Sequence, residues 1–395
     1  MSRVTRLTAL CAVLAAAAGC VSTASTPSQS NTQPIKVGAV LTMSGPAAQI
    51  GLAQLAGIQI AVDKLNSGKG VLGRKLQVVP QDDAGDATKA AQAARDLVDQ
   101  ENVDFVVGPT LSAPGLAAVP VTTAGKKLSA MSGVVPDLGD ATKYPYNFRM
   151  SPAASLQAQT FVAYMQKAGL KRAGLLAVNT PLGTSNIDAF KAALGSNSDI
   201  KIADAEFHDS GQVDLVPQLT KLKNSGADTL LVLNTAVPDQ IAAIKARRAV
   251  GWTAPALGFS TMADPAVSAA VGADGMKDVY AGQQYKFLTK SGTTQATKDV
   301  LAAYRNKVNQ HPLKSDATQV LGGYDFVMLI ANAFNKVGSL DPDKARKYLE
   351  TNQFVGAKAI DHYDASRHDG EILDTLVFVL ADSFDDGFYT VAPGQ

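Results

Sequence analysis

Cysteine is almost missing from this sequence. Its 395 residues include only two, Cys11 and Cys20. A disulfide framework or a cysteine-based zinc site needs more thiols than this, and both must be excluded for the chain that follows residue 20. A thiol nucleophile is excluded there for the same reason.

The sequence also lacks an excess of either charge and lacks long apolar runs in its main part. It has 36 Lys and Arg against 35 Asp and Glu, a net charge of +1. A nucleic-acid-binding protein would carry an excess of basic residues, so no nucleic-acid partner is expected. Beyond the N-terminus no apolar run reaches the ~18 residues of a membrane span. What remains is a chain that is 46% hydrophobic and long enough for about two domains.

The N-terminus has the features of an export signal. Arg3 and Arg6 precede an apolar stretch over residues 7–18, which is too short to span a bilayer. This stretch ends in Ala-Ala-Gly-Cys at residues 17–20. That ending resembles a bacterial lipobox and predicts a signal peptide over 1–19 with lipidation at Cys20. An ordinary cleaved signal with an incidental cysteine is the alternative.

A polar segment follows Cys20. Residues 21–34, VSTASTPSQSNTQP, are nearly all Ser, Thr, Gln, Asn and Pro. Such a composition cannot bury apolar surface and is typical of a flexible tether. We therefore expect residues 20–34 to be a lipid-anchored tether that holds an exported domain at the outer face of the cell membrane, where two acyl chains would give stable anchoring.

The rest of the chain alternates short apolar runs with segments of helical periodicity, and does so twice. This alternation predicts an α/β fold of two doubly wound, Rossmann-like lobes with parallel sheets. The first series has expected strands at 35–41, 76–79, 105–108 and 128–131, and expected helices at 49–66, 88–99 and 112–119. The second has expected strands at 173–178, 200–207, 229–233 and 256–259, and expected helices at 154–167, 185–194, 213–224 and 239–249.

Two long helices and a strand pair are expected near the C-terminus. The helices cover 294–309 and 318–337, and the strands 360–363 and 376–380 are expected to pair across a turn at Asp369-Gly370. Ligands of doubly wound sheets bind at the carboxyl ends of the strands. This rule selects the loops at 42–51, 109–112, 132–135, 179–185, 234–238 and 260–264.

Several short motifs occur in a characteristic order. They are KVG at 36–38 with LTMSGP at 41–46, NSGKGVLGRKL at 66–76, QDDA at 81–84, VGP at 107–109 with Ser112, and the Tyr-Asp pairs at 324–325 and 363–364. In this order they resemble the leucine/isoleucine/valine-binding family, the type I periplasmic solute receptors of branched-chain amino-acid ABC importers. The resemblance covers residues 35 to 390.

The resemblance implies a two-lobed receptor with a three-segment hinge. One lobe would comprise 35–149 and 283–357, and the other 150–282 and 358–395. Closure of the hinge would bury a small solute in the cleft, and an ABC permease with its ATPase subunits would then accept it. The resemblance implies a monomer without a cofactor.

The family's site residues carry over only in part. Ser112 matches the serine that binds the ligand carboxylate, although it could instead be a plain N-cap of a helix starting at Ala113. Ser132 and Val134 occupy the next loop, where the family has a carbonyl and a threonine. The other positions carried over are Ser44, Ile50, Leu111, Gly133, Leu182, Ala236, Ser260 and Gln319.

The departures from the family pattern affect the expected ligand. Family tyrosines correspond to Ile50, Leu182 and Ala236, and a family aromatic to Gln319. The acidic residue that would neutralise a ligand ammonium corresponds to Ser260, with Asp264 as a possible substitute. Because an unpaired buried ammonium is costly, the sequence predicts a hydrophobic or aromatic carboxylate in preference to an amino acid.

Other classes of function fit the sequence less well. A ligand-sensing module of the same fold, partnered with a membrane sensor or regulator, is the main alternative. An enzyme is disfavoured because no G-x-S-x-G elbow, P-loop or Rossmann glycine fingerprint occurs. The residues His362, Asp364, His368 and Asp369 are interpreted as a polar turn in preference to a metal site, and Asp82-Asp83 as a strand end in preference to an acid–base pair.

Overall fold

The computed structural model describes residues 33–395 except 46, 197, 235 and 315–316. The expected signal peptide at 1–19, Cys20 and most of the tether lie outside the described residues. Among the residues that are described, no helix is both long and apolar enough to cross a membrane.

The first sheet has five parallel strands in the order β2-β1-β3-β4-β5. Strand β1 (Ile35–Leu41), which lies between β2 and β3, is almost entirely buried, as expected of a strand covered on both faces. Strand β5, which was not predicted, adds a short edge. The other strands are β2 (Leu76–Asp82), β3 (Phe105–Val107), β4 (Ser129–Met131) and β5 (Asn147–Arg149).

The second sheet has six strands in the order β13-β10-β9-β8-β6-β7. All neighbours in it are parallel except β10 and β13, which are antiparallel. Strand β10 was not predicted. The strands are β6 (Arg172–Val178), β7 (Lys201–His208), β8 (Thr229–Leu233), β9 (Ala256–Gly258), β10 (Val279–Tyr285) and β13 (Leu376–Leu380).

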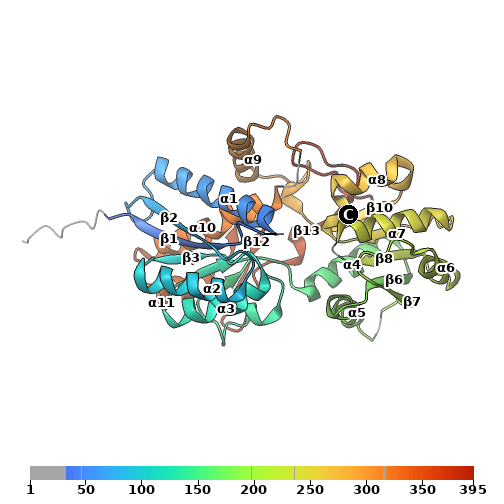
Figure 1. Cartoon of the computed structure of the whole chain (residues 1–395), viewed down its shortest axis with the longest axis horizontal. Helices are drawn as coiled ribbons and strands as arrows, with labels where there is room; N and C mark the ends of the chain where they lie inside the picture. Colours follow the sequence, from blue (N-terminus) through green and yellow to red (C-terminus); the bar gives the residue numbers. More distant parts are fainter. Residues whose placement is uncertain (1–32, 46, 197, 235, 315–316) are drawn as a thin grey trace, which may run out of the picture. The chain divides into compact units, whose positions relative to one another are not determined.

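The helices follow the predicted pattern, with α8 and α11 in addition. The helix expected at 88–99 is α2 followed by a π-helical turn at Asp96–Gln100. Helix α1 packs along α10, and α2 along α3 (Figure 1). The helices are α1 (Ala48–Ser67), α2 (Ala87–Arg95), α3 (Ser112–Ala124), α4 (Ala154–Ala168), α5 (Pro181–Leu194), α6 (Val216–Asn224), α7 (Val237–Ala249), α8 (Pro265–Gly275), α9 (Gln295–Val308), α10 (Thr318–Val337) and α11 (Pro342–Leu349).

The expected pairing of strands near the C-terminus is wrong. Strand β12 (Ile360–Asp361) pairs with β11 (Phe354–Val355), whereas β13 pairs with β10 of the second sheet. The segment around Asp369-Gly370 is not a hairpin turn, because the backbone N–H of Arg149 donates to the carbonyl of His368 and that of Gly370 to the carbonyl of Arg149. These bonds attach the segment to the edge of the first sheet, which separates β12 from β13.

The α/β fold with mainly parallel sheets is therefore confirmed. Helices α9, α10 and α11 follow β10 in the chain, yet α9 and α10 pack on α1 of the first sheet's layer. The chain then returns to the second sheet at β13. The lobe boundaries at 149/150, 282/283 and 357/358 remain a prediction.

Candidate functional site

The first group of predicted site residues lies at the carboxyl edge of the first sheet. Ser112 and Leu111 follow β3, while Ser132, Gly133 and Val134 follow β4. Parallel strands end at a common edge, so these two loops are neighbours. Ile50, half-buried in the first turn of α1, and the exposed Ser44 follow β1 at the same edge.

Ser112 joins these two loops. The backbone N–H of Val134 donates to its Oγ at 3.0 Å. Helix α3 begins at Ser112 itself with Leu111 as its N-cap, and no side chain caps it. The N-cap alternative for Ser112 is therefore wrong, because its hydroxyl is directed to the neighbouring loop. The first turn of α3 still presents the backbone N–H groups of Ser112 and Ala113, since Pro114 has none.

A hydrogen-bonded set of neutral side chains lies directly behind this edge. The Gln54 amide nitrogen donates to Ser132 Oγ at 2.7 Å and to Gln319 Oε1 at 3.0 Å. The Gln54 amide oxygen accepts from Thr110 Oγ1 at 2.9 Å. We call Gln54, Thr110, Ser132 and Gln319 the Gln54 network. It brings together two predicted site residues, Ser132 and Gln319, and two that sequence reasoning missed.

Gln54 is completely buried, as is expected of an amide whose polar atoms are all bonded. One sequence signal could have found it. Gln54 lies four residues from both Ile50 and Ile58, so it falls within the apolar stripe of α1. A glutamine in such a stripe has to find partners inside the protein. Thr110 had no such signal, because its partners come from distant parts of the sequence.

Two glycines allow α1 to come close enough to α10 for this network to form. A Cβ at Gly57 would lie 1.9 Å from the carbonyl oxygen of Val320, and a Cβ at Gly323 would lie 2.1 Å from that of Gln54. Both distances are impossible for real atoms, so any side chain here would push the helices apart. The close crossing places Gln319, in the first turn of α10, within reach of Gln54.

The paired acidic residues after β2 support the neighbouring loop. Asp82 Oδ1 accepts from the backbone N–H groups of Met43 and Ala84, and Thr42 Oγ1 donates to Asp83 Oδ1 at 2.7 Å. The Thr42 N–H in turn donates to Thr110 Oγ1 at 3.1 Å. These bonds hold the β1–α1 loop against the Gln54 network, which fits the interpretation of Asp82-Asp83 as a strand end.

The second group of predicted site residues lies at the carboxyl edge of the second sheet. Leu182 is in the first turn of α5 after β6 and is 41% exposed. Ala236 is the N-cap of α7 after β8, and the exposed Ser260 opens a 3-10 turn after β9. Each residue therefore lies in the kind of loop that was predicted. That they share one site with Ser112 remains a prediction.

Asp264, the possible partner of a ligand ammonium, has a structural task. It is the N-cap of α8, and its carboxylate accepts from the backbone N–H of Ala266 at 2.8 Å. A carboxylate at a helix N-terminus is stabilised there by the helix dipole. This arrangement gives the residue a role that does not require a ligand.

A charged cluster is buried where the chain passes between the regions of the two sheets. Lys358 Nζ lies 2.8 Å from Glu371 Oε1 and donates to the carbonyl oxygen of Met150 at 2.6 Å. The Tyr285 hydroxyl donates to Glu371 Oε1 at 2.9 Å. Asp325 accepts from the backbone N–H groups of Ala357 and Lys358, both at 2.7 Å. We call Lys358, Glu371, Tyr285 and Asp325 the Lys358 cluster.

The pKa values in this cluster are set by burial and by the neighbouring charges. Burial alone would lower the pKa of Lys358, but the negative charge of Glu371 more than offsets this, so the pKa lies above its ordinary value. Burial raises the pKa of Asp325 to about 6, despite its two backbone hydrogen bonds. Lys358 therefore stays protonated at any physiological pH.

Near this cluster, His368 is part of the packing. Its ring stacks on Phe148 with a centroid distance of 4.1 Å, and its Nδ1 lies 2.8 Å from the carbonyl oxygen of Asn147. Asp364 accepts from Ser366 and Arg367 within a turn. Within the described ranges, no group of three or more His, Cys, Asp and Glu side chains is placed so that it could hold a metal ion.

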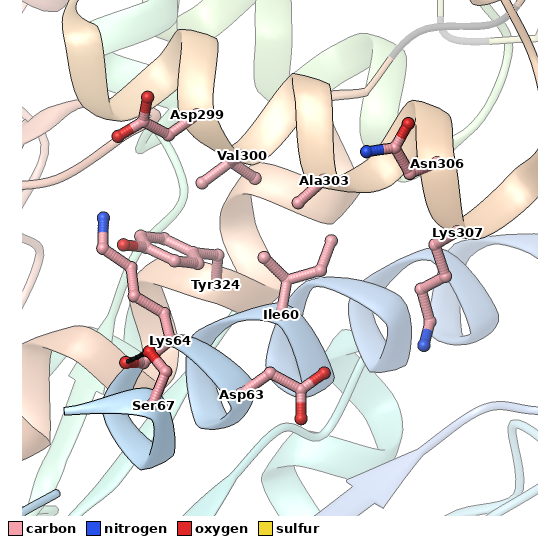
Figure 2. A pocket seen from close by; sticks show the side chains of 10 residues that line it. All are labelled: Ile60, Asp63, Lys64, Ser67, Asp299, Val300, Ala303, Asn306, Lys307 and Tyr324. Atoms are coloured by element: carbon pink, nitrogen blue, oxygen red, sulfur yellow. Dashed lines mark hydrogen bonds between the residues drawn. The ribbon is translucent and has the colours of Figure 1, made fainter.

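A pocket of about 690 Å³ is lined by residues of α1, α9 and α10 (Figure 2). Lys64 lies over the ring of Tyr324 at 5.6 Å from its centroid. The wall mixes apolar side chains with charges of both signs. The lining residues are Ile60, Asp63, Lys64, Ser67, Asp299, Val300, Ala303, Asn306, Lys307 and Tyr324. None of the predicted site residues is among them.

Two α/β sheets with candidate binding residues at their carboxyl edges are the arrangement expected of a solute receptor. The family model described as periplasmic binding protein matches residues 34–383, and the chain belongs to this family. It is 26% identical over 346 residues to a Leu/Ile/Val-binding protein homolog of Brucella suis, with 83% of this chain and 84% of that protein covered.

Solved structures show the same fold. The isoleucine complex of a branched-chain amino acid transporter substrate-binding protein from Streptococcus pneumoniae has a TM-score of 0.71 at 24% identity, with 91% of this chain and 99% of that chain covered. A solute-binding protein of an ABC transporter from R. palustris, in complex with 4-hydroxybenzoate, has a TM-score of 0.70 at 19% identity, with 91% and 96% covered. The type I periplasmic binding protein fold is thereby established, and the family implies export and a small-molecule ligand.

Proposed function

We propose that this protein is the extracytoplasmic receptor of an ABC importer and that it captures a small organic acid with an apolar body. Its two lobes would close on the solute, and the permease with its ATPase subunits would accept it. The receptor would act as a monomer without enzymatic activity, tethered by a lipid on Cys20.

The ligand class rests mainly on the state of Asp264. A bound amino acid brings an ammonium group that needs an anionic partner, and the candidate for that partner already accepts a backbone hydrogen bond as the N-cap of α8. Ser112 and the free N–H groups at the start of α3 favour a carboxylate. Ile50, Val134, Leu182 and Ala236 would supply an apolar surround.

The importer-receptor proposal is tested by ligand-induced stabilisation and closure. A ligand that binds only the folded state stabilises it by RT ln(1 + [L]/Kd), which is ~2.7 kcal/mol at a hundredfold excess over Kd. We expect organic acids with apolar bodies to raise the melting temperature and to reduce the radius of gyration in solution scattering. Stabilisation without any change in scattering would contradict the closing mechanism.

The tether is tested separately. Cys20→Ala should move the protein from the membrane fraction to the soluble fraction, because an unacylated N-terminus has no anchor. Cys11→Ala, within the expected signal peptide, is the matched control and should leave the fractionation unchanged. A Cys20→Ala protein that stays with the membrane would reject the lipid anchor.

A further inference from the structure

The Ser132 hydroxyl donates its proton to a group in the protein interior. Its Oγ donates to the carbonyl oxygen of Thr110 at 3.2 Å and accepts from the Gln54 amide nitrogen at 2.7 Å. A hydroxyl has one proton and two lone pairs, so only one lone pair is left. Ser132 is half-buried, whereas Gln54 and Thr110 are buried, so the remaining lone pair is on the outward side.

This result does not depend on which way the Gln54 amide is turned. If its oxygen and nitrogen were exchanged, the Ser132 proton would point to the Gln54 oxygen instead of the Thr110 carbonyl. In both cases the hydroxyl proton would point into the protein, so Ser132 could only accept a hydrogen bond from a ligand. The surrounding bonds to Thr110 and Gln319 fix the Gln54 amide, so the Ser132 side chain has little freedom to rotate.

From this arrangement we infer that Ser132 selects ligands with a hydrogen-bond donor beside the acid group, that is, α-hydroxy acids over α-keto acids. Ser112, proposed to bind the carboxylate, is bonded to Val134 two residues after Ser132, so the donor must lie close to the acid. A hydroxy acid offers an O–H to Ser132 without the cost of an unpaired ammonium. A keto acid offers only lone pairs, which the Ser132 lone pair repels. Gln54 is a positioning residue in this scheme.

The inference rests on the proposed function, and two matched series of ligands test it. The leucine-like series is α-hydroxyisocaproate, isocaproate, α-ketoisocaproate and leucine. The phenylalanine-like series is phenyllactate, hydrocinnamate, phenylpyruvate and phenylalanine. In titration calorimetry on the intact protein we expect the hydroxy acid of the preferred series to bind about tenfold more tightly than the keto acid. The plain acid should lie between them.

Variants separate the role of the hydroxyl from a general structural role. Ser132→Ala should reduce the preference for the hydroxy acid over the keto acid to within about twofold. Ser132→Thr keeps the hydroxyl and should restore the preference. Gln54→Met should lower the preference several-fold, because it frees the Ser132 side chain. Gln59→Met, on the same helix but outside the Gln54 network, is the control and should match the wild type.

The outcomes distinguish this inference from the proposed function. If acids bind but the hydroxy and keto acids have equal affinities, the inference is overturned and the proposed function stands. If the keto acid binds more tightly, Ser132 is a donor and the inference is likewise overturned. If leucine or phenylalanine binds most tightly but the hydroxy acid still exceeds the keto acid, the inference is supported and the acid preference fails. If no acid and no amino acid binds, the proposed function fails, and the inference fails with it.

Discussion

The protein buries two polar clusters that differ in their chemistry. The Gln54 network consists of amides and hydroxyls without a formal charge. The Lys358 cluster contains an ammonium and two carboxyl groups, and the side chains of Lys358 and Glu371 are only 5% and 1% exposed. Neutral polar groups can be buried once they are hydrogen-bonded, whereas buried charges also require a partner of opposite charge.

This difference in charge indicates different roles for the two clusters. A neutral network can leave one member half-exposed, as Ser132 is, because a ligand or water can complete its bonds at modest cost. The Lys358 cluster is closed, and it joins backbone segments that are far apart in sequence, since Lys358 donates to the carbonyl of Met150. We infer that the Gln54 network serves recognition, while the Lys358 cluster fixes the path of the chain.

The largest expected effect is on the Lys358 cluster. Lys358→Met keeps the length of the side chain but leaves Glu371 buried without its partner. Breaking a buried pair in this way costs ~3–5 kcal/mol. We expect the free energy of unfolding, measured by urea denaturation, to fall by that amount.

Lys290→Met is the matched control for this change. Lys290 Nζ lies 2.8 Å from Asp385, the same distance as in the buried pair, but the two side chains are 54% and 66% exposed. Exposed ion pairs contribute about 0–1 kcal/mol to the free energy of unfolding. Equal losses of unfolding free energy in the two variants would show that burial does not strengthen the Lys358 pair. The assignment of different roles to the two clusters would then be wrong.

A second prediction concerns pH and Asp325. Its pKa is raised to about 6, so the folded protein holds this proton more tightly than the unfolded chain does. The resulting stabilisation is complete below about pH 4 and is lost as the pH rises to about 6. It amounts to at most about 3 kcal/mol. We expect Asp325→Asn to remove this part of the decline in unfolding free energy between about pH 4 and pH 6.

Asp364→Asn provides the comparison for the pH series. The Ser366 hydroxyl and backbone hydrogen bonds lower the pKa of Asp364, which lies in an exposed turn. Its contribution to stability is present above its ordinary pKa and is lost as the pH falls below about 4. The variant should therefore keep the wild-type profile between about pH 4 and pH 6. An Asp325→Asn profile parallel to the wild type in this interval would contradict the assignment.

Much of the fold could be predicted from the sequence because buried parallel strands are continuous apolar runs. Strands β1 and β8 were found in this way with their observed bounds. Strand β10 was missed because Gly282, Gln283 and Gln284 interrupt its apolar pattern. The Asp369-Gly370 pair has the local signal of a hairpin, but the edge of the first sheet offered the segment a better partner. Pairing between distant strands is decided by tertiary contacts, which a local pattern does not contain.

The candidate site was predictable to a smaller extent. The rule that ligands bind at the carboxyl ends of strands selected the loops of Ser112, Ser132 and Leu182 correctly as strand-end loops. The bond from Val134 to Ser112 and the inward direction of the Ser132 proton depend on the spacing of the loops after β3 and β4 and of helix α1, which no sequence pattern describes. Gln54 had a usable signal in its place on the apolar face of α1.

A smaller effect than these two, and the one that bears most directly on recognition, concerns Ser112. Ser112→Ala should weaken a carboxylate ligand such as α-hydroxyisocaproate by about 1.5–3 kcal/mol, the usual contribution of a hydrogen bond to a charged group. Ser268→Ala, whose hydroxyl donates to the carbonyl oxygen of Pro265 in its own helix, should leave the affinity unchanged. The loss could instead arise because Val134 has lost its acceptor on Ser112. Titration with the uncharged amide of the same acid separates the two causes. A displaced Val134 loop would weaken acid and amide equally, whereas direct binding of the carboxylate by Ser112 requires the larger loss for the acid.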